Sequence, residues 1–240
     1  MYVQQLWRYP VKSLRGEQLD AADVRFGGVR GDRLLHVESD RGLITARTHP
    51  RLLSLSATLD SDGEVLVDGR RWWDPAVEHA VRATAGPDAR LVPYAGLERF
   101  DILPLLIATD GAIAVFGQDG RRLRPNIVLG GVEGLAERGW VNKILTLGTI
   151  VIHLHSLRSR CIVTTYDPDT LAQDVNVLRD IRRRFDGTLA LNAAVLAPGV
   201  VHVGDRADVV EALTDIAPAA ARPSCMRRRP RHPGERRSRR

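Results

Sequence analysis

Hydrophobic and polar residues alternate with a period of two along much of the chain, which is the pattern of half-buried β-strands. Glycine, aspartate and proline separate these segments, as at Ser61-Asp62-Gly63 and Ala197-Pro198-Gly199, where they favour turns. The strands predicted in this way are Val3–Arg8, Gln18–Phe26, Leu34–Val37, Leu52–Leu59, Glu64–Val67, Arg124–Leu129, Ile144–Leu147, Thr149–Leu154, Arg160–Tyr166, Leu189–Leu196 and Val200–Val203.

Two segments have helical features instead. Thr109 and Asp110 follow an apolar run and can cap a short helix through about Phe116. Val175–Phe185 has apolar residues at 177, 178, 181 and 185, the spacing of one helix face. We see no internal repeat and no βαβ alternation. The pattern predicts a mainly β, α+β fold with a barrel-like body and a few short helices.

Length and hydropathy limit the class of protein. The chain has 240 residues, 44% of them hydrophobic, enough for one large or two small domains. No run approaches the roughly 20 unbroken apolar residues that cross a bilayer, and the first residues lack the apolar run of a signal peptide. We expect a cytoplasmic protein without membrane contact.

The net charge of +6 is concentrated at one end of the chain. Residues 222–240 hold nine arginines and one glutamate, a charge of +8, which leaves −2 for the rest. We expect residues 214–240 to form a disordered Arg-rich tail, because it has no apolar periodicity. Such a tail could attract RNA non-specifically, but it lacks interleaved aromatic residues and any RNA-binding motif, so we expect no specific nucleic-acid partner.

The cysteine content excludes several kinds of site. Cys161 and Cys225 are the two cysteines of the chain, too few for a disulfide framework or for a zinc or iron–sulfur site alone. No G-x-G-x-x-G fingerprint of a dinucleotide site follows a predicted strand. If the chemistry needs electrons, a separate protein must bring them.

Four short segments are more polar than their strand context requires, namely Tyr9–Ser13, Gly31–Arg33, Arg124–Asn126 and Ser159–Cys161. Each also has a structural explanation when it is considered alone. The first could be a solvated turn, the second a surface ion pair of little energetic value, the third an asparagine bonded to local backbone, and the last an inert buried thiol.

The setting of Cys161 favours chemistry. Arg158 and Arg160 precede it, and cationic neighbours favour the thiolate, which both ligates metals and attacks electrophiles. A nucleophile needs an oriented histidine, and His153 and His155 have no obvious orienting carboxylate, so the metal-ligand interpretation is the stronger one.

Three other basic residues suggest a phosphorylated ligand. Lys12, Arg33 and Arg124 each lie near a hydroxyl or amide side chain or beside another charged residue. Arginine offers a planar fork and lysine a point charge to phosphate oxygens. A phosphorylated cofactor beside a thiolate is the simplest combination of these features.

With these residues identified, the chain resembles the MOSC proteins (molybdenum cofactor sulfurase C-terminal domain), including their N-terminal β-barrel domain. The runs that carry the resemblance are YPVKSLRG at 9–16, GDRLLHV at 31–37, TARTHPRL at 45–52, RPNIVLGG at 124–131 and SRCIVTTYDPDT at 159–170. It implies an N-terminal β-rich domain at 1–97 and a MOSC domain at 98–213. Within the family, the pattern is most similar to the amidoxime-reducing components and their bacterial counterparts.

The resemblance also implies roles for individual residues. Cys161 would be the protein ligand of molybdenum and the catalytic residue. The implied contacts of the pterin cofactor or its phosphate are Lys12, Ser13, Arg33, Asp101, Arg124, Asn126, Ser159 and Arg160. Ile102 and Leu103 depart from the hydroxyl residues that relatives often carry there. Arg47 would either face the substrate or brace the barrel.

The implied function is that of a molybdenum-dependent oxidoreductase. It would hold a molybdenum pterin cofactor and reduce small N-hydroxylated or N-oxide-type substrates. Its electrons would come from an external flavin, haem or iron–sulfur protein. The alternative is a module that carries the cofactor or transfers sulfur, as a sulfurase does, without turnover.

Overall fold

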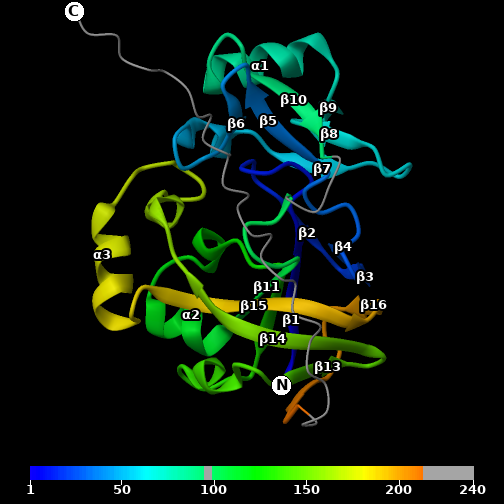
Figure 1. Ribbon diagram of the computed structural model, residues 1–240, viewed down its shortest axis with the longest axis vertical. Helices are drawn as coiled ribbons and strands as arrows, with labels where there is room; N and C mark the ends of the chain where they lie inside the picture. Colours follow the sequence, from blue (N-terminus) through cyan, green and yellow to red (C-terminus); the bar gives the residue numbers. More distant parts are fainter. Residues whose placement is uncertain (95–98, 213–240) are drawn as a thin grey trace, which may run out of the picture.

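The computed structural model describes residues 1–94 and 99–212, which form two parts stacked along the long axis of the molecule (Figure 1). The predicted Arg-rich tail at 214–240, with Cys225, lies outside the described residues. In Figure 1 the upper part contains α1 and the strands β5 to β10, and the lower part contains α2, α3 and the long strands β14 and β15.

One eight-stranded sheet forms the lower part. Its strands in spatial order are β17 (Ala207–Val210), β13 (Ile144–Leu147), β14 (Ile150–Ser159), β15 (Thr188–Ala197), β11 (Leu105–Thr109), β12 (Ile127–Gly130), β1 (Tyr2–Arg8) and β2 (Glu17–Leu19). The strand order begins at β17 and ends at β2, so the ladders of the described residues do not close into a barrel, although an isolated bridge joins Tyr2 of β1 to Arg206 just before β17. The mainly β, α+β class predicted from the sequence is confirmed.

Three smaller sheets complete the strand content. They are β10 (Arg90–Pro93) with β5 (Leu35–Ser39) and β6 (Gly42–Ile44), β16 (Gly199–His202) with β3 (Ala21–Arg25) and β4 (Gly28–Val29), and β7 (Ala57–Leu59) with β8 (Val65–Val67) and β9 (Arg70–Arg71).

Helices are short. The α-helices are α1 (Pro75–Ala85), α2 (Asp110–Phe116) and α3 (Val175–Arg184), and the 3-10 turns are η1 (Pro50–Ser54), η3 (Gly120–Leu123), η4 (Ala136–Trp140) and η5 (Ile162–Thr165). Both predicted helices are confirmed, and Thr109 caps α2 by accepting from the Ala112 amide. The sequence prediction missed α1, although Asp74 as N-cap and Pro75 in the first turn are start signals.

The described residues form four hydrophobic clusters, two of them large. The larger fills the main sheet and includes residues of β1, β3, β11 to β15 and β16, whereas the smaller packs α1 against the strands of the upper part. The N-terminal strand β1 therefore belongs to the lower part, whereas Val11 and Leu14, which follow it, already belong to the smaller core before the chain returns to the main sheet at β2. The predicted domain boundary at 97/98 lies outside the described residues and stays a prediction.

Several predicted strands were wrong in detail. Arg160–Tyr166 is not a strand, because Thr164 donates to the Cys161 carbonyl through both its amide (3.1 Å) and its hydroxyl (2.8 Å), which closes the turn η5. The segment predicted as Leu52–Leu59 is a strand only from Ala57, since Pro50 begins the turn η1. A break at Asp20 divides the segment predicted as Gln18–Phe26 into β2 and β3.

Although the sequence shows no βαβ alternation, the structure contains one βαβ unit that was not predicted. Strands β11 and β12 are parallel neighbours, and α2 with η3 connects them. The unit is compact, and its helix is only 7 residues long. It therefore produced little helical periodicity in the sequence. No helix among the described residues has the length and apolar character needed to cross a membrane.

Candidate cofactor site

A cavity of about 450 Å³ lies between the two parts. Its walls hold every predicted site residue except Asn126, that is Lys12, Ser13, Arg33, Asp101, Arg124, Ser159, Arg160 and Cys161. Thr45, Ala46 and Arg47 contribute from the upper part, and Ile102, Leu106, Leu123, Arg158 and Val163 add further wall. Residues far apart in the sequence therefore meet at one place.

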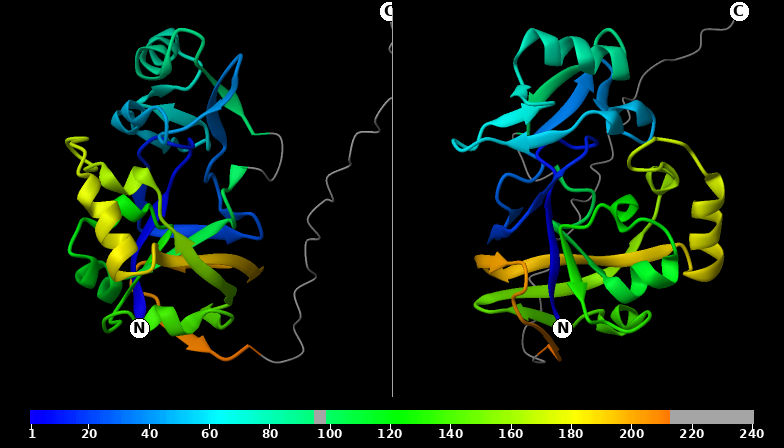
Figure 2. Two further views of the ribbon diagram at one scale, coloured as in Figure 1. Left: turned by 60° about the vertical axis from the view of Figure 1, so that its left-hand side comes forward. Right: turned by 180° about the vertical axis from the view of Figure 1, so that it is seen from behind.

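Cys161 is held where the longest strands end. Strand β14 is 10 residues long and stops at Ser159, after which the Arg160 amide donates to the Gly187 carbonyl at 2.9 Å. Cys161 then begins η5, and its free thiol belongs to the cavity wall. Figure 2 shows from two further sides that the yellow-green segment around η5 reaches the junction of the two parts.

Arg160 carries unused hydrogen-bonding capacity. Its Nη2 donates to the Leu123 carbonyl at 2.7 Å, whereas Nε and Nη1 are buried without a partner. Burial, and next the charge of Arg158, lower the pKa of Arg160 to about 10. A desolvated cation with two unsatisfied donors is unfavourable unless an anion compensates it.

Tyr9 supports two other arginines. The guanidinium of Arg124 lies 4.3 Å and that of Arg33 5.4 Å from the centre of its ring, within the range of cation–π attraction. The Tyr9 hydroxyl donates to the Pro125 carbonyl at 3.2 Å, and burial raises its pKa to about 12. Burial also lowers the pKa of Arg124, so both partners are largely removed from water.

Three cavity residues have left-handed backbone conformations. The φ angles are 75° at Ser13, 52° at Arg33 and 56° at Arg124, a region that residues with a Cβ rarely occupy. Strained backbone of this kind concentrates at functional sites, where the surrounding structure holds it in place. Three of the four predicted polar segments share this property, which no pattern in the sequence indicated.

The structural explanations for two of the segments fit poorly. Ser13 is 9% exposed, and its hydroxyl accepts from the Ala46 amide at 2.9 Å, so the segment is not a solvated turn. Asp32 is 1% exposed, pairs with Arg33 and accepts from the Tyr9 amide at 2.7 Å. The Asp32–Arg33 pair is thus buried and orders the loop, rather than lying on the surface.

Asp101 joins three cations on one wall. Its carboxylate contacts Lys12 at 2.9 Å, Arg158 at 2.8 Å and Arg47 at 3.1 Å. Burial alone would raise the pKa of Asp101, but the hydrogen bond and charge of Lys12, with the two arginines, lower it to about 2. Arg47 therefore lines the cavity and pairs with Asp101 on its wall, and the choice between a substrate-facing and a bracing role stays a prediction.

This carboxylate predicts a pH dependence of stability. A pKa below the ordinary value means that Asp101 stabilises the fold above about pH 4 and that this contribution disappears as the pH falls through about 2. Because the side chain is 35% exposed, screening reduces the contribution to about 1 kcal/mol. We expect Asp101→Asn to lower the free energy of unfolding in urea by about this amount at pH 7. The difference from the unaltered chain should close between pH 4 and 2, and a constant difference would contradict this role.

Asn126 has a different position from the other predicted residues. Its side chain accepts from the Leu106 amide at 3.1 Å and donates to the Trp7 carbonyl at 3.4 Å. It borders a smaller neighbouring cavity that also includes Arg33, Asp101 and Leu103. These two hydrogen bonds to the backbone fit the explanation that Asn126 orders the chain around it. Its role in binding a cofactor stays a prediction.

Arg158 is the site residue that sequence reasoning used only as a neighbour of Cys161. It lies on the cavity wall, and besides Asp101 it contacts the Asn192 side-chain oxygen at 3.2 Å. Its position two residues before Arg160, near the end of β14, was the available signal. The residues 1–94 and 99–212 contain no cluster of three or more His, Cys, Asp or Glu that could hold a metal. His153 and His155 do not line the cavity.

Comparison with known proteins finds two domain models that match this chain. Residues 1–89 match the MOSC N-terminal beta barrel domain, and residues 115–208 match the MOSC domain. Human mitochondrial amidoxime-reducing component 1 is 26% identical over 85% of this chain and 81% of its own length. Bovine mitochondrial amidoxime reducing component 2 is 25% identical over 70% of this chain and 67% of its own length.

Among solved structures, the YUAD protein from Bacillus subtilis aligns over 87% of this chain and 94% of its own, with 14% identity and a TM-score of 0.48. The two domain matches occur in the chain in the same order as the two predicted domains, and together they span most of the sequence. The chain therefore belongs to the MOSC domain family.

Proposed function

We propose that the cavity binds a molybdenum pterin cofactor and that the chain is an oxidoreductase for small N-hydroxylated or N-oxide-type substrates. The observation that carries the proposal is the placement of Cys161 in one cavity with Arg160, whose Nε and Nη1 are buried without partners. Relatives named as amidoxime-reducing components support the choice of reaction.

The charge of the cavity fits an anionic cofactor. Its walls hold six basic side chains, Lys12, Arg33, Arg47, Arg124, Arg158 and Arg160, against the single carboxylate of Asp101. Nε and Nη1 of Arg160 would donate to oxygen acceptors such as those of a phosphate or a pterin. Cys161 would supply the protein's sulfur ligand, since thiolates are preferred ligands of soft metal centres.

When bound, the molybdenum pterin supplies the redox chemistry, and the protein binds and orients it. Arg33 and Arg124 are fixed by the ring of Tyr9, so they would meet an anionic group without having to reorganise. Lys12 and Arg158 are fixed by Asp101 in the same way.

Reduction of an amidoxime to an amidine consumes two electrons and two protons and releases one water. A one-electron carrier must therefore deliver electrons twice in each turnover. The chain has two cysteines, too few for an iron–sulfur cluster, and it shows no dinucleotide fingerprint, so we propose an external electron-transfer protein as the donor.

We predict that Lys12→Ala and Arg124→Ala each weaken cofactor retention. Each removes a charge-assisted contact worth about 1.5–3 kcal/mol, or roughly ten- to over a hundredfold in affinity. Molybdenum and pterin fluorescence measured before and after dialysis give the retention. Arg138→Ala is a matched control, because Arg138 is a partly buried arginine that pairs with Asp186 away from the cavity. Retention equal to that of the control would remove both residues from the cofactor site.

A cytoplasmic location also stays a prediction. The curated relatives are named as mitochondrial proteins. Microscopy of a fluorescent fusion in cells of the source organism would test it.

A further inference from the structure

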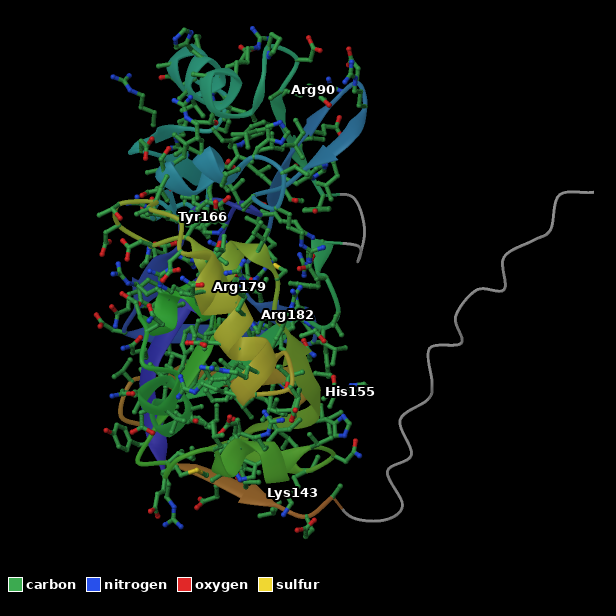
Figure 3. All side chains as sticks on the ribbon, turned by 90° about the vertical axis from the view of Figure 1, so that its left-hand side faces the viewer. Arg90, Lys143, His155, Tyr166, Arg179 and Arg182 are labelled. Carbon is green, nitrogen blue, oxygen red and sulfur yellow. The ribbon has the colours of Figure 1, made fainter. Side chains whose placement is uncertain are left out.

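We propose that the outer face of α3, together with η5, is the docking surface for an acidic one-electron carrier protein. The inference rests on the proposed function, which requires such a carrier. The docking surface is defined here by Ile162, Val175, Arg179 and Arg182, and Figure 3 shows α3 at the front of the molecule with Arg179 and Arg182 along it.

The helix separates an apolar face from a basic one. Val177 and Ile181 are buried, whereas Val175, Arg179 and Arg182 are exposed. The exposed positions are spaced i, i+4 and i+7, which places them in one stripe on the side opposite to the buried pair. The stripe therefore faces solvent because α3 packs its other side on the core.

Stabilisation of the helix explains only some of the arginines in α3. Arginines in the last turn complement the helix dipole, and Arg183 pairs with Asp180 at 3.0 Å while Arg184 donates to the Val115 carbonyl at 2.6 Å. Arg179 lies a turn earlier and contacts only the neutral side chain of Asn176, at 3.1 Å. Neither Arg179 nor Arg182 forms an ion pair with a carboxylate among residues 1–94 and 99–212.

The same surface lies beside the proposed cofactor. Ile162 follows Cys161 directly and is 38% exposed, and Val175 at the start of α3 is 46% exposed. The Asp174 amide donates to the Thr165 carbonyl at 2.9 Å, so the start of α3 is bonded to the end of η5. One 3-10 turn thus separates Cys161 from the helix. Electron transfer slows steeply with distance, so a carrier must dock close to this turn.

The composition of the surface indicates the partner. Interfaces commonly combine a small apolar centre with arginines, and Ile162 and Val175 supply apolar area beside two unpaired arginines. A cationic surface accelerates association with an acidic protein and releases it quickly in salt. This suits a carrier that must bind, transfer one electron and leave.

The test uses the double variant Arg179→Glu/Arg182→Glu and the probes flavodoxin and plant-type [2Fe–2S] ferredoxin, each with its reductase. The matched control is Arg30→Glu/Arg70→Glu, which makes the same charge change at side chains that are 77% and 63% exposed. These residues adjoin β4 or lie in β9, on the side of the molecule away from α3 (Figure 1).

We expect at least one probe to bind the unaltered chain in a calorimetric titration at low salt. The α3 variant should weaken that binding by about tenfold or more, and the control variant by much less. Turnover driven by the same carrier should fall with it, whereas turnover driven by reduced viologen should stay unchanged. Equal weakening in both variants, or binding of neither probe, would overturn the docking surface. If the unaltered, molybdenum-loaded chain shows no turnover with reduced viologen, that result would instead refute the proposed function.

Discussion

Replacing Cys161 by serine is expected to reduce molybdenum-dependent turnover to background while the protein stays folded. The change reduces the volume of the side chain only slightly but removes the sulfur that would bind the metal. Loss of a group that only orients a metal ligand already costs about 10- to 100-fold in activity or metal affinity, so loss of the ligand itself should cost more. Turnover of benzamidoxime with reduced viologen measures the effect.

Two controls make this result specific. Cys225→Ser removes the other cysteine of the chain, and we expect it to keep wild-type turnover. The melting temperature of Cys161→Ser should be close to that of the cofactor-free wild-type chain, because the Cys161 thiol forms no hydrogen bond or ion pair with the other described residues. Turnover of Cys161→Ser at the wild-type rate would exclude Cys161 from the site.

The second large effect concerns the source of electrons. We expect the purified protein with NADH alone to leave an N-hydroxylated substrate such as benzamidoxime unreduced. Addition of reduced viologen, or of a one-electron carrier with its reductase, should start turnover. The reason is the composition of the chain, which offers neither a dinucleotide fingerprint nor cysteines for an iron–sulfur cluster.

Oxidation of NADH coupled to amidine formation by this chain alone would contradict that expectation. Failure with viologen despite full molybdenum loading would have a different meaning. It would favour the alternative in which the chain carries the cofactor or transfers sulfur through Cys161. Detection of a persulfide on Cys161 by mass spectrometry would then distinguish sulfur transfer from cofactor carriage.

Much of the fold followed from local patterns in the sequence. Strands such as β13 and β15 alternate or hold long apolar runs between clear turn residues, and α3 has a complete apolar face. The errors occurred where a side chain forms a local hydrogen bond to the backbone in place of strand pairing, or where proline begins a turn. At Cys161 the hydroxyl of Thr164 bonds the backbone locally, and no pattern of hydrophobicity reports such a bond.

The candidate site was predictable in its members but not in its organisation. The conspicuous polar segments supplied Lys12, Arg33, Arg124 and Cys161, and the cavity brings these residues together. The bracing of three cations by Asp101 depends on contacts between residues more than fifty positions apart, which a single sequence does not reveal.

Molybdenum content tests the central claim most directly. The chain should be produced in a host that synthesises the molybdenum pterin cofactor and, as a control, in a strain that cannot make it. Metal analysis of the purified, folded protein should find molybdenum close to stoichiometric with the chain from the first host and none from the second. Folded protein without molybdenum from both hosts would contradict the account.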